Sequence, residues 1–415
     1  MTPVHARICQ RRRPQLPHRS AHIGIALAAV VVAATGVAGE PTPKPVEIVI
    51  VGAPDRGVFD PSIAGDGRQL YMTFSGVGST GRLRDLNHNA VQTFLARSVD
   101  EGRTWRLVGG AVNPTVDAGA GATPSRGDRR WQSEVSTLAF DPYAPPRARW
   151  TLFWHQYLNA DGARRFEHGW IAYKQAETAE GLAAATPIKL MAARGYSRID
   201  DDPSATTRPP IAGPPILRLN DLHHDLATCL VASEPSALAR PDGLYLAFAC
   251  FRASAAGLGG VKTDIAMLKC ARPCEATKPG AWSYVATVLS QRDAETLGLR
   301  KFSATDLFHA DGRDFVMVSP VGINPGPDAY KGCVAFPFAD IARGAVVRRG
   351  DGAPEASAAV ALQKDSFNGA CDLLPVGPLR GLLIGRIDFS AREGVIQAMF
   401  RIYASGVMPD VKTAP

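Results

Sequence analysis

Residues 59–74 read FDPSIAGDGRQLYMTF, and residues 233–248 read SEPSALARPDGLYLAF. In both stretches an acid opens a short apolar run, an Asp-Gly pair follows, and a second apolar run contains a tyrosine 11 residues after the acid. Short apolar runs separated by Gly, Pro and Asp predict two strands joined by a tight turn. The two stretches are therefore two copies of one predicted hairpin.

Three further stretches repeat this order, and together the five copies predict the fold. Residues 302–318 read FSATDLFHADGRDFVMV, residues 369–384 read GACDLLPVGPLRGLLI, and a looser copy begins at 133–137 (SEVST) and resumes at 150–154 (WTLFW). The second runs are anchored 68 to 93 residues apart, at Tyr71, Leu152, Tyr245, Phe315 and Leu383. Further strand-like segments follow at 91–96, 170–174, 264–269, 333–338 and 396–403. We expect an all-β, five-bladed β-propeller of four-stranded antiparallel sheets, with one or two antiparallel sandwiches as the alternative.

The composition agrees with a folded chain of short strands. The 415 residues are 46% hydrophobic and include 40 Gly and 32 Pro, which suits many tight turns and excludes wholesale disorder. The formal charge of +7 arises largely before residue 40, where five arginines and no acid occur. Without these arginines the balance is 41 basic to 39 acidic residues, so a nucleic-acid partner loses its main support.

The basic N-terminal segment has the layout of a targeting signal. An apolar run of 15 residues at 23–37 follows the arginines, and small residues precede Glu40 and a Pro-rich stretch. This layout predicts a secretory signal peptide over 1–39, a linker over 40–46 and one propeller domain over 47–408. An uncleaved anchor is the alternative, but the run is shorter than the roughly 20 residues that span a bilayer. We expect a secreted or periplasmic protein with no stable membrane span after signal removal.

The cysteines support an oxidising compartment. Cys9 lies in the predicted signal, and an even number remain: Cys229, Cys250, Cys270, Cys274, Cys333 and Cys371. Six cysteines allow 15 pairings, and we expect disulfides between nearest neighbours in sequence. A zinc site at Cys270 and Cys274 is the alternative, although no second Cys or His pair at ligand spacing accompanies them.

Residues 98–105 read SVDEGRTW and fit the Asp-box pattern Ser-x-Asp-x-Gly-x-Thr-Trp in full. In such a turn the Asp accepts backbone N–H groups, the Gly takes a positive φ and the Trp is buried. The structural residues are Ser98, Asp100, Gly102, Thr104 and Trp105. The pattern resembles the repeats of sialidases and other exported propellers, although the sequence lacks the Arg-Ile-Pro start of sialidases.

The start at Phe59 and the five-fold count are similar to the five-bladed glycosidases, that is, the arabinanase, β-xylosidase and invertase-type families. In those families acids from the innermost strands face a central funnel. The resemblance implies Asp60 as base or nucleophile and Glu234 as proton donor, with Glu134, Asp306 and Asp372 competing for a third, orienting role. The sequence departs from the pattern at Glu234, where several of these families have an Asp.

The same residue types satisfy the chemistry of glycoside hydrolysis independently of the resemblance. That reaction needs one carboxylic acid to protonate the leaving oxygen and one carboxylate to attack or to activate water. Acids at matching positions of the inner strands would converge on one pocket. The competing interpretation is structural, because an acid at the start of a strand often caps a turn.

Several other polar or aromatic side chains are candidates for substrate binding: His88, Trp131, His155, His223 and His224. The tryptophan has packing between blades as its competing role. Residues 200–202 and 220–225 are rich in Asp, Asn and His. They are either a solvated loop or a calcium site, and we otherwise expect no metal or cofactor.

The sequence thus predicts an exported, carbohydrate-active propeller, leaning to a glycoside hydrolase of exo-acting or sialidase-like type. A non-catalytic propeller that binds a glycan or a protein is the alternative. Neither a phosphate-binding glycine loop nor a Gly-x-Ser-x-Gly elbow occurs in the motif contexts they require, so nucleotide-dependent and serine-hydrolase chemistry lack support.

Overall fold

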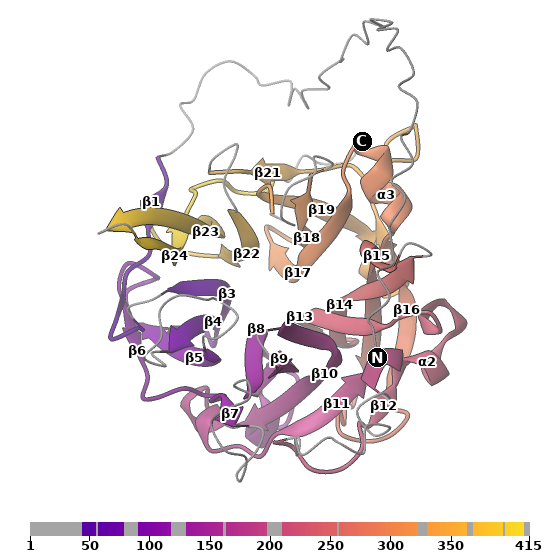
Figure 1. Ribbon diagram of the computed structural model, residues 1–415, viewed down its shortest axis with the longest axis horizontal. Coiled ribbons are helices and arrows are strands. Elements are labelled where there is room, and N and C mark those ends of the chain that lie inside the picture. The colour runs from indigo at the N-terminus through magenta and orange to yellow at the C-terminus, as the bar shows by residue number, and fades with distance from the viewer. Residues whose placement is uncertain are drawn as a thin grey trace, which may run out of the picture. The chain divides into compact units, whose positions relative to one another are not determined.

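The computed structural model describes residues 44–54, 57–78, 90–117, 130–160, 163–196, 210–254, 257–322, 330–362, 368–392 and 395–410. The predicted signal segment, His88 and the Asp cluster at 200–202 lie outside these residues. The described chain is nearly all β, and its strands form five sheets (Figure 1). No helix in the described ranges is long and apolar enough to cross a membrane.

The first sheet runs outward from its innermost strand in the order β3 (Val58–Gly65), β4 (Leu70–Gly78), β5 (Ala90–Ser98), β6 (Trp105–Leu107) and β2 (Ile50–Val51). The second contains β7 (Val116–Asp117), β8 (Arg130–Phe140), β9 (Trp150–Ala160), β10 (Ala163–Ala176), β11 (Ile188–Ala192) and β12 (Leu217–Arg218). The third contains β13 (Val231–Arg240), β14 (Gly243–Ser254), β15 (Gly257–Ala271) and β16 (Trp282–Leu289).

The fourth sheet contains β17 (Lys301–Ala310), β18 (Arg313–Val321), β19 (Cys333–Asp340), β20 (Ala345–Val346) and β21 (Ala358–Val360). The fifth contains β22 (Asn368–Leu374), β23 (Gly381–Arg392), β24 (Val395–Ala404) and β1 (Val46–Glu47). Two short α-helices are described, α2 (Leu219–Leu222) and α3 (Gln291–Thr296). The 3₁₀ turns are Pro146–Ala148, Glu180–Ala183, Arg194–Tyr196, His224–Leu226 and Ile341–Arg343.

The five-bladed propeller predicted from the repeats is confirmed. The strands β3, β8, β13, β17 and β22 contact one another in sequence, and β22 contacts β3, which closes the ring (Figure 1). All five anchors lie buried on the second strand of their sheets, and three sheets carry extra short strands beyond the expected four. The N-terminal β1 pairs antiparallel with the C-terminal β24, so the last blade is built from both ends of the described chain. Aromatic side chains pack between neighbouring blades, as Tyr71 does against Trp150.

Each innermost strand contains one extra residue relative to its partner strand. The pairing of β3 with β4, for example, shifts between Phe59 and Ser62. The residue in each bulge has a positive φ of 48° to 55°, which is unusual for residues other than glycine. These bulge residues are Asp60, Val135, Glu234, Ala304 and Ala370. A bulge re-aims side chains and is over-represented next to active sites, so this feature sets which way the inner-strand side chains point.

The disulfides and the turn at 98–105 agree with the sequence predictions. Disulfides join Cys229 to Cys250, Cys270 to Cys274 and Cys333 to Cys371, as the spacing predicted. The turn at 98–105 has the expected contacts. Asp100 accepts hydrogen bonds from the Thr104 N–H and hydroxyl at 2.9 and 2.8 Å, Gly102 has φ +82°, and Trp105 is buried.

Candidate active site

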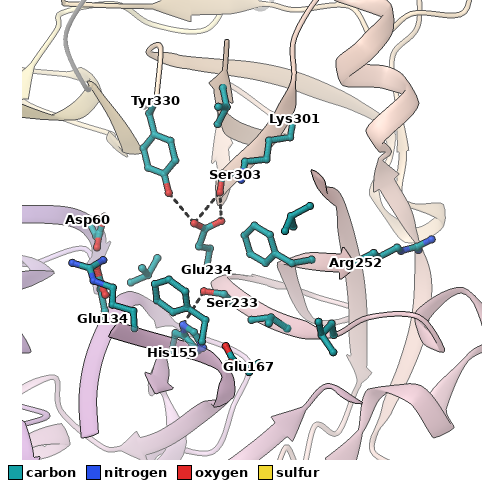
Figure 2. A pocket seen from close by; sticks show the side chains of 18 of the residues that line it. Asp60, Glu134, His155, Glu167, Ser233, Glu234, Arg252, Lys301, Ser303 and Tyr330 are labelled. Atoms are coloured by element: carbon teal, nitrogen blue, oxygen red, sulfur yellow. Dashed lines mark hydrogen bonds and ion pairs between the residues drawn. The ribbon is translucent and has the colours of Figure 1, made fainter. Parts of the chain in front are cut away.

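A cavity of about 510 Å³ opens where the innermost strands converge (Figure 2). Three of the five predicted acids line it: Asp60, Glu134 and Glu234. They come from β3, β8 and β13, which are consecutive blades. All three are at least 90% buried, so their charges are poorly hydrated and act strongly on one another.

Glu234 is held by donors from the neighbouring fourth blade. The Ser303 hydroxyl lies 2.9 Å from both carboxylate oxygens, and the Ala304 N–H donates at 2.6 Å. The Tyr330 hydroxyl donates at 2.8 Å, and Figure 2 shows Glu234 pointing between Ser303 and Tyr330. Burial raises the pKa of Glu234, and these donors, together with the charge of Lys301, oppose that rise. The donors complement an ionised carboxylate.

Asp60 has a different environment. Burial raises its pKa well above the ordinary value, and the nearby carboxylates of Glu134 and Glu234 raise it further, against a hydrogen bond from Ser75. Its Oδ2 atom has no hydrogen-bond partner among the described residues. An acid that is desolvated and adjacent to carboxylates retains its proton, so the surroundings of Asp60 favour the neutral form.

Glu134 lies next to Asp60 in Figure 2 and has its own counter-ion. Arg164, on β10, lies 3.5 Å from the Glu134 carboxylate, and the Tyr157 hydroxyl donates a hydrogen bond to it. The Arg164 charge opposes the rise in the pKa of Asp60. Glu134 is thus paired with Arg164 and Tyr157, and its charge raises the pKa of the adjacent Asp60 carboxyl.

His155 and Ser233 contact each other in the same cavity as the acids. The Ser233 hydroxyl lies 2.9 Å from His155 Nδ1, and both residues line the cavity. Burial lowers the pKa of His155 to about 3, so its ring is neutral over the physiological range. The ring stacks on Phe166 with centroids 5.7 Å apart.

Asp306 and Asp372 do not line this cavity. Both stand two residues after the bulge of their strands, whereas Asp60 and Glu234 are the bulge residues themselves. Asp306 accepts a hydrogen bond from the Ser236 hydroxyl at 2.8 Å. Asp372 accepts one from the backbone N–H of Ile63. The inner strands therefore present their acids in two layers: Asp60, Glu134 and Glu234 line the cavity, and Asp306 and Asp372, the other candidates for the orienting role, do not.

The remaining predicted side chains that the structure describes do not line the cavity. Trp131 is fully buried and packs on Trp170 with ring centroids 4.9 Å apart, which is an internal packing role. His223 and His224 are not among the cavity residues. With Asp225 they offer ligand atoms within 4.8 Å of one another. Two imidazoles and one carboxylate suit calcium poorly, because calcium prefers six to eight oxygen ligands. The calcium site expected in this region stays a prediction.

Four site residues were not predicted from the sequence: Arg164, Ser233, Ser303 and Tyr330. Ser233 and Ser303 each precede a bulge residue, so an alignment of the strands on their bulges would have selected both. Tyr330 follows the fourth hairpin and belongs to no repeat. Four phenylalanines complete the walls: Phe59, Phe166, Phe251 and Phe400.

The sequence matches no protein-family model and no curated protein. Several solved structures are similar to this chain. Zg3597, a family 117 glycoside hydrolase of the marine bacterium Zobellia galactanivorans, is 10% identical, with a TM-score of 0.48 over 87% of this chain and 89% of that chain. The α-L-arabinofuranosidase PaAbf62A of Podospora anserina is 10% identical, with a TM-score of 0.46 over 88% and 95%. The GH43 endo-arabinanase of Bacillus licheniformis is 13% identical, with a TM-score of 0.41 over 84% and 94%. At these TM-scores no conclusion about the activity of this chain follows.

Proposed function

We propose that this protein is a glycoside hydrolase that uses Asp60 and Glu234 as its two catalytic carboxyls. The observation that carries the proposal is the gathering of Asp60, Glu134 and Glu234 around one open cavity, in surroundings that raise the pKa of Asp60 further than that of Glu234. Pairs of carboxyls whose environments separate their proton affinities are the acid and base of this reaction class.

The surroundings support the two roles in the order opposite to that implied by the family resemblance. Asp60 retains a proton beside the Glu134 carboxylate, so it is the group that protonates the leaving oxygen. Glu234, with donors from Ser303, Ala304 and Tyr330, is the carboxylate that attacks the anomeric carbon or activates water. Glu134 neither protonates the leaving oxygen nor attacks the anomeric carbon. Its charge beside Asp60 keeps the Asp60 carboxyl protonated.

The cavity walls suit a sugar substrate. A volume of about 510 Å³ lies within the usual range of small-ligand sites. The phenylalanine rings offer apolar faces against which the C–H face of a sugar ring packs. Ser233, whose hydroxyl contacts the neutral His155, offers a hydrogen-bonding group beside the acids.

Export is part of the proposal. Three disulfides in the described chain fit an oxidising compartment, in agreement with the secretory signal expected over residues 1–39. A glycoside hydrolase in the periplasm or outside the cell would meet glycans directly.

The test is hydrolysis of a panel of 4-nitrophenyl glycosides and unmodified glycans by the purified wild type, Asp60→Asn and Glu234→Gln. Glu355→Gln, at an exposed position, serves as the matched control. We expect the wild type and the control to cleave the same substrate, and each active-site variant to lose about 10²-fold or more of kcat on unmodified glycans. Binding of a glycan without turnover by the wild type would instead establish the non-catalytic alternative.

A further inference from the structure

A second, smaller cavity of about 20 Å³ lies on the axis of the propeller, and Asp60 lines both cavities. All five innermost strands contribute to its wall, through the bulge residues and those that follow them. The small cavity therefore lies at the level between the carboxyls of the large cavity and the second layer, which contains Asp306.

The wall of the small cavity is unusually rich in buried oxygens without partners. Asp60 Oδ2, Ser136 Oγ and Thr305 Oγ1 have no hydrogen-bond partner among the described residues. Asp306 Oδ2 is the fourth such atom, and the Asp306 side chain also interacts with Asp372. Each of the four lining residues is at most 8% exposed. The four residues come from three different blades and line this one cavity.

Buried polar atoms in folded proteins are almost always hydrogen-bonded, and an unsatisfied one costs roughly 1–3 kcal/mol. A buried water typically makes two to four hydrogen bonds, and it needs a cavity of at least about 10–15 Å³. The axial cavity meets both requirements for one water molecule.

We propose that the axial cavity binds one ordered water molecule, which joins the Asp60 carboxyl to the hydroxyls of Ser136 and Thr305 and to Asp306. The catalytic consequence rests on the proposed function: the water fixes the orientation of the Asp60 carboxyl and connects it to the Asp306 and Asp372 pair. Thr305 and Ser136 are then positioning residues, because they act on Asp60 only through the water.

This connection makes the protonation of Asp60 depend on groups that the substrate never touches. On the substrate side Asp60 faces Glu134, Glu234 and Arg164, and on the opposite side the water links it to Asp306. Removing a hydrogen bond from a carboxyl changes the balance between its neutral and ionised forms.

The experiment compares the wild type with Thr305→Val, which removes one hydroxyl at nearly constant volume. Thr263→Val is the matched control, because its hydroxyl is also buried without a partner among the described residues but lines neither cavity. Crystal structures at a resolution that shows waters provide the first readout, which is independent of activity. We expect one water in contact with Asp60 and Thr305 in the wild type and in Thr263→Val, and its loss or displacement in Thr305→Val.

The second readout is the pH profile of kcat/KM. We expect its alkaline limb to shift by about one pH unit in Thr305→Val and to stay in place in Thr263→Val. An axial cavity without a water, or one that holds a metal ion at ligand distances of about 2.3–2.6 Å, would overturn the proposal. An ordered water in a protein that hydrolyses no glycoside would support the water site while refuting the proposed function.

Discussion

The Asp372 carboxylate on the last blade accepts a hydrogen bond from the backbone N–H of Ile63 on the first blade. The same relationship links earlier blades, where Ser62 accepts from the Leu138 N–H at 3.0 Å and Ser236 accepts from the Leu307 N–H at 2.7 Å. In each case the accepting side chain lies two residues after the bulge residue of one inner strand. The donating N–H lies three residues after the bulge residue of the inner strand in the next blade. Hydrogen bonds in the second layer therefore fasten neighbouring blades together below the active site.

Removing the Asp372 link between the last and first blades should destabilise the protein. Asp372→Ala removes the acceptor for Ile63 and leaves a partly buried N–H unpaired, so we expect the free energy of unfolding to fall by about 2 kcal/mol. Asp372→Asn keeps a carbonyl acceptor and should lose less. Urea denaturation measures both, and equal stability of the alanine variant and the wild type would show that the Asp372–Ile63 link contributes nothing.

The charges around Asp60 predict opposite shifts for two variants. Glu134 raises the pKa of Asp60 and Arg164 lowers it. Because a proton donor loses activity as pH rises through its pKa, Glu134→Gln should move the alkaline limb of kcat/KM to lower pH. Arg164→Gln should move the same limb to higher pH. Shifts confined to the acidic limb would instead identify Asp60 as the base.

His155 gives a pH dependence of stability that can be isolated by one substitution. Its pKa is about 3 in the folded protein and near 6.5 in the unfolded chain. Between these values the unfolded chain binds the extra proton, so this residue makes stability fall as pH decreases from about 6.5 towards 3. The difference in unfolding free energy between wild type and His155→Gln should change by up to about 1.4 kcal/mol per pH unit in that window. A difference independent of pH would contradict a neutral, buried His155.

The disulfides should contribute unequally to stability. The Cys333–Cys371 bond spans 38 residues and joins β19 to β22 in the next blade, whereas Cys270–Cys274 spans only 4. A crosslink that closes a longer loop restricts the unfolded chain more, so replacing both residues of the first pair with serine should cost about 2–4 kcal/mol. The corresponding loss for the second pair should be smaller. Thermal unfolding of the two double variants compares them directly.

The sequence predicted the ring of blades well because each blade repeats one local pattern. The acid, the turn and the buried anchor on the second strand lie within about 20 residues of one another, and short-range propensities decide all three. The disulfide pairing could be predicted for a similar reason, because the paired cysteines are neighbours in sequence.

The layering of the acids could not be predicted in the same way. The place of the bulge sets which side chains of an inner strand reach the large cavity. Asp60 and Glu234 are the bulge residues of their strands, whereas Glu134 precedes the bulge residue of the second blade, Val135. A non-glycine residue with positive φ has no distinctive sequence signal. Arg164 and Tyr330 were missed because tertiary contacts alone bring them to Glu134 and Glu234.

The most direct test of the central claim is the dependence of kcat on the leaving group. A 4-nitrophenolate leaves without protonation, whereas a sugar alcohol needs a proton donor. We predict that Asp60→Asn cleaves the nitrophenyl substrate at close to the wild-type rate and loses about 10²-fold or more on the unmodified glycan. Glu234→Gln should be slow on both substrates, with azide restoring its rate on the nitrophenyl one. Equal losses for Asp60→Asn on both substrates, together with rescue of that variant by azide, would contradict the assignment of Asp60 as the proton donor.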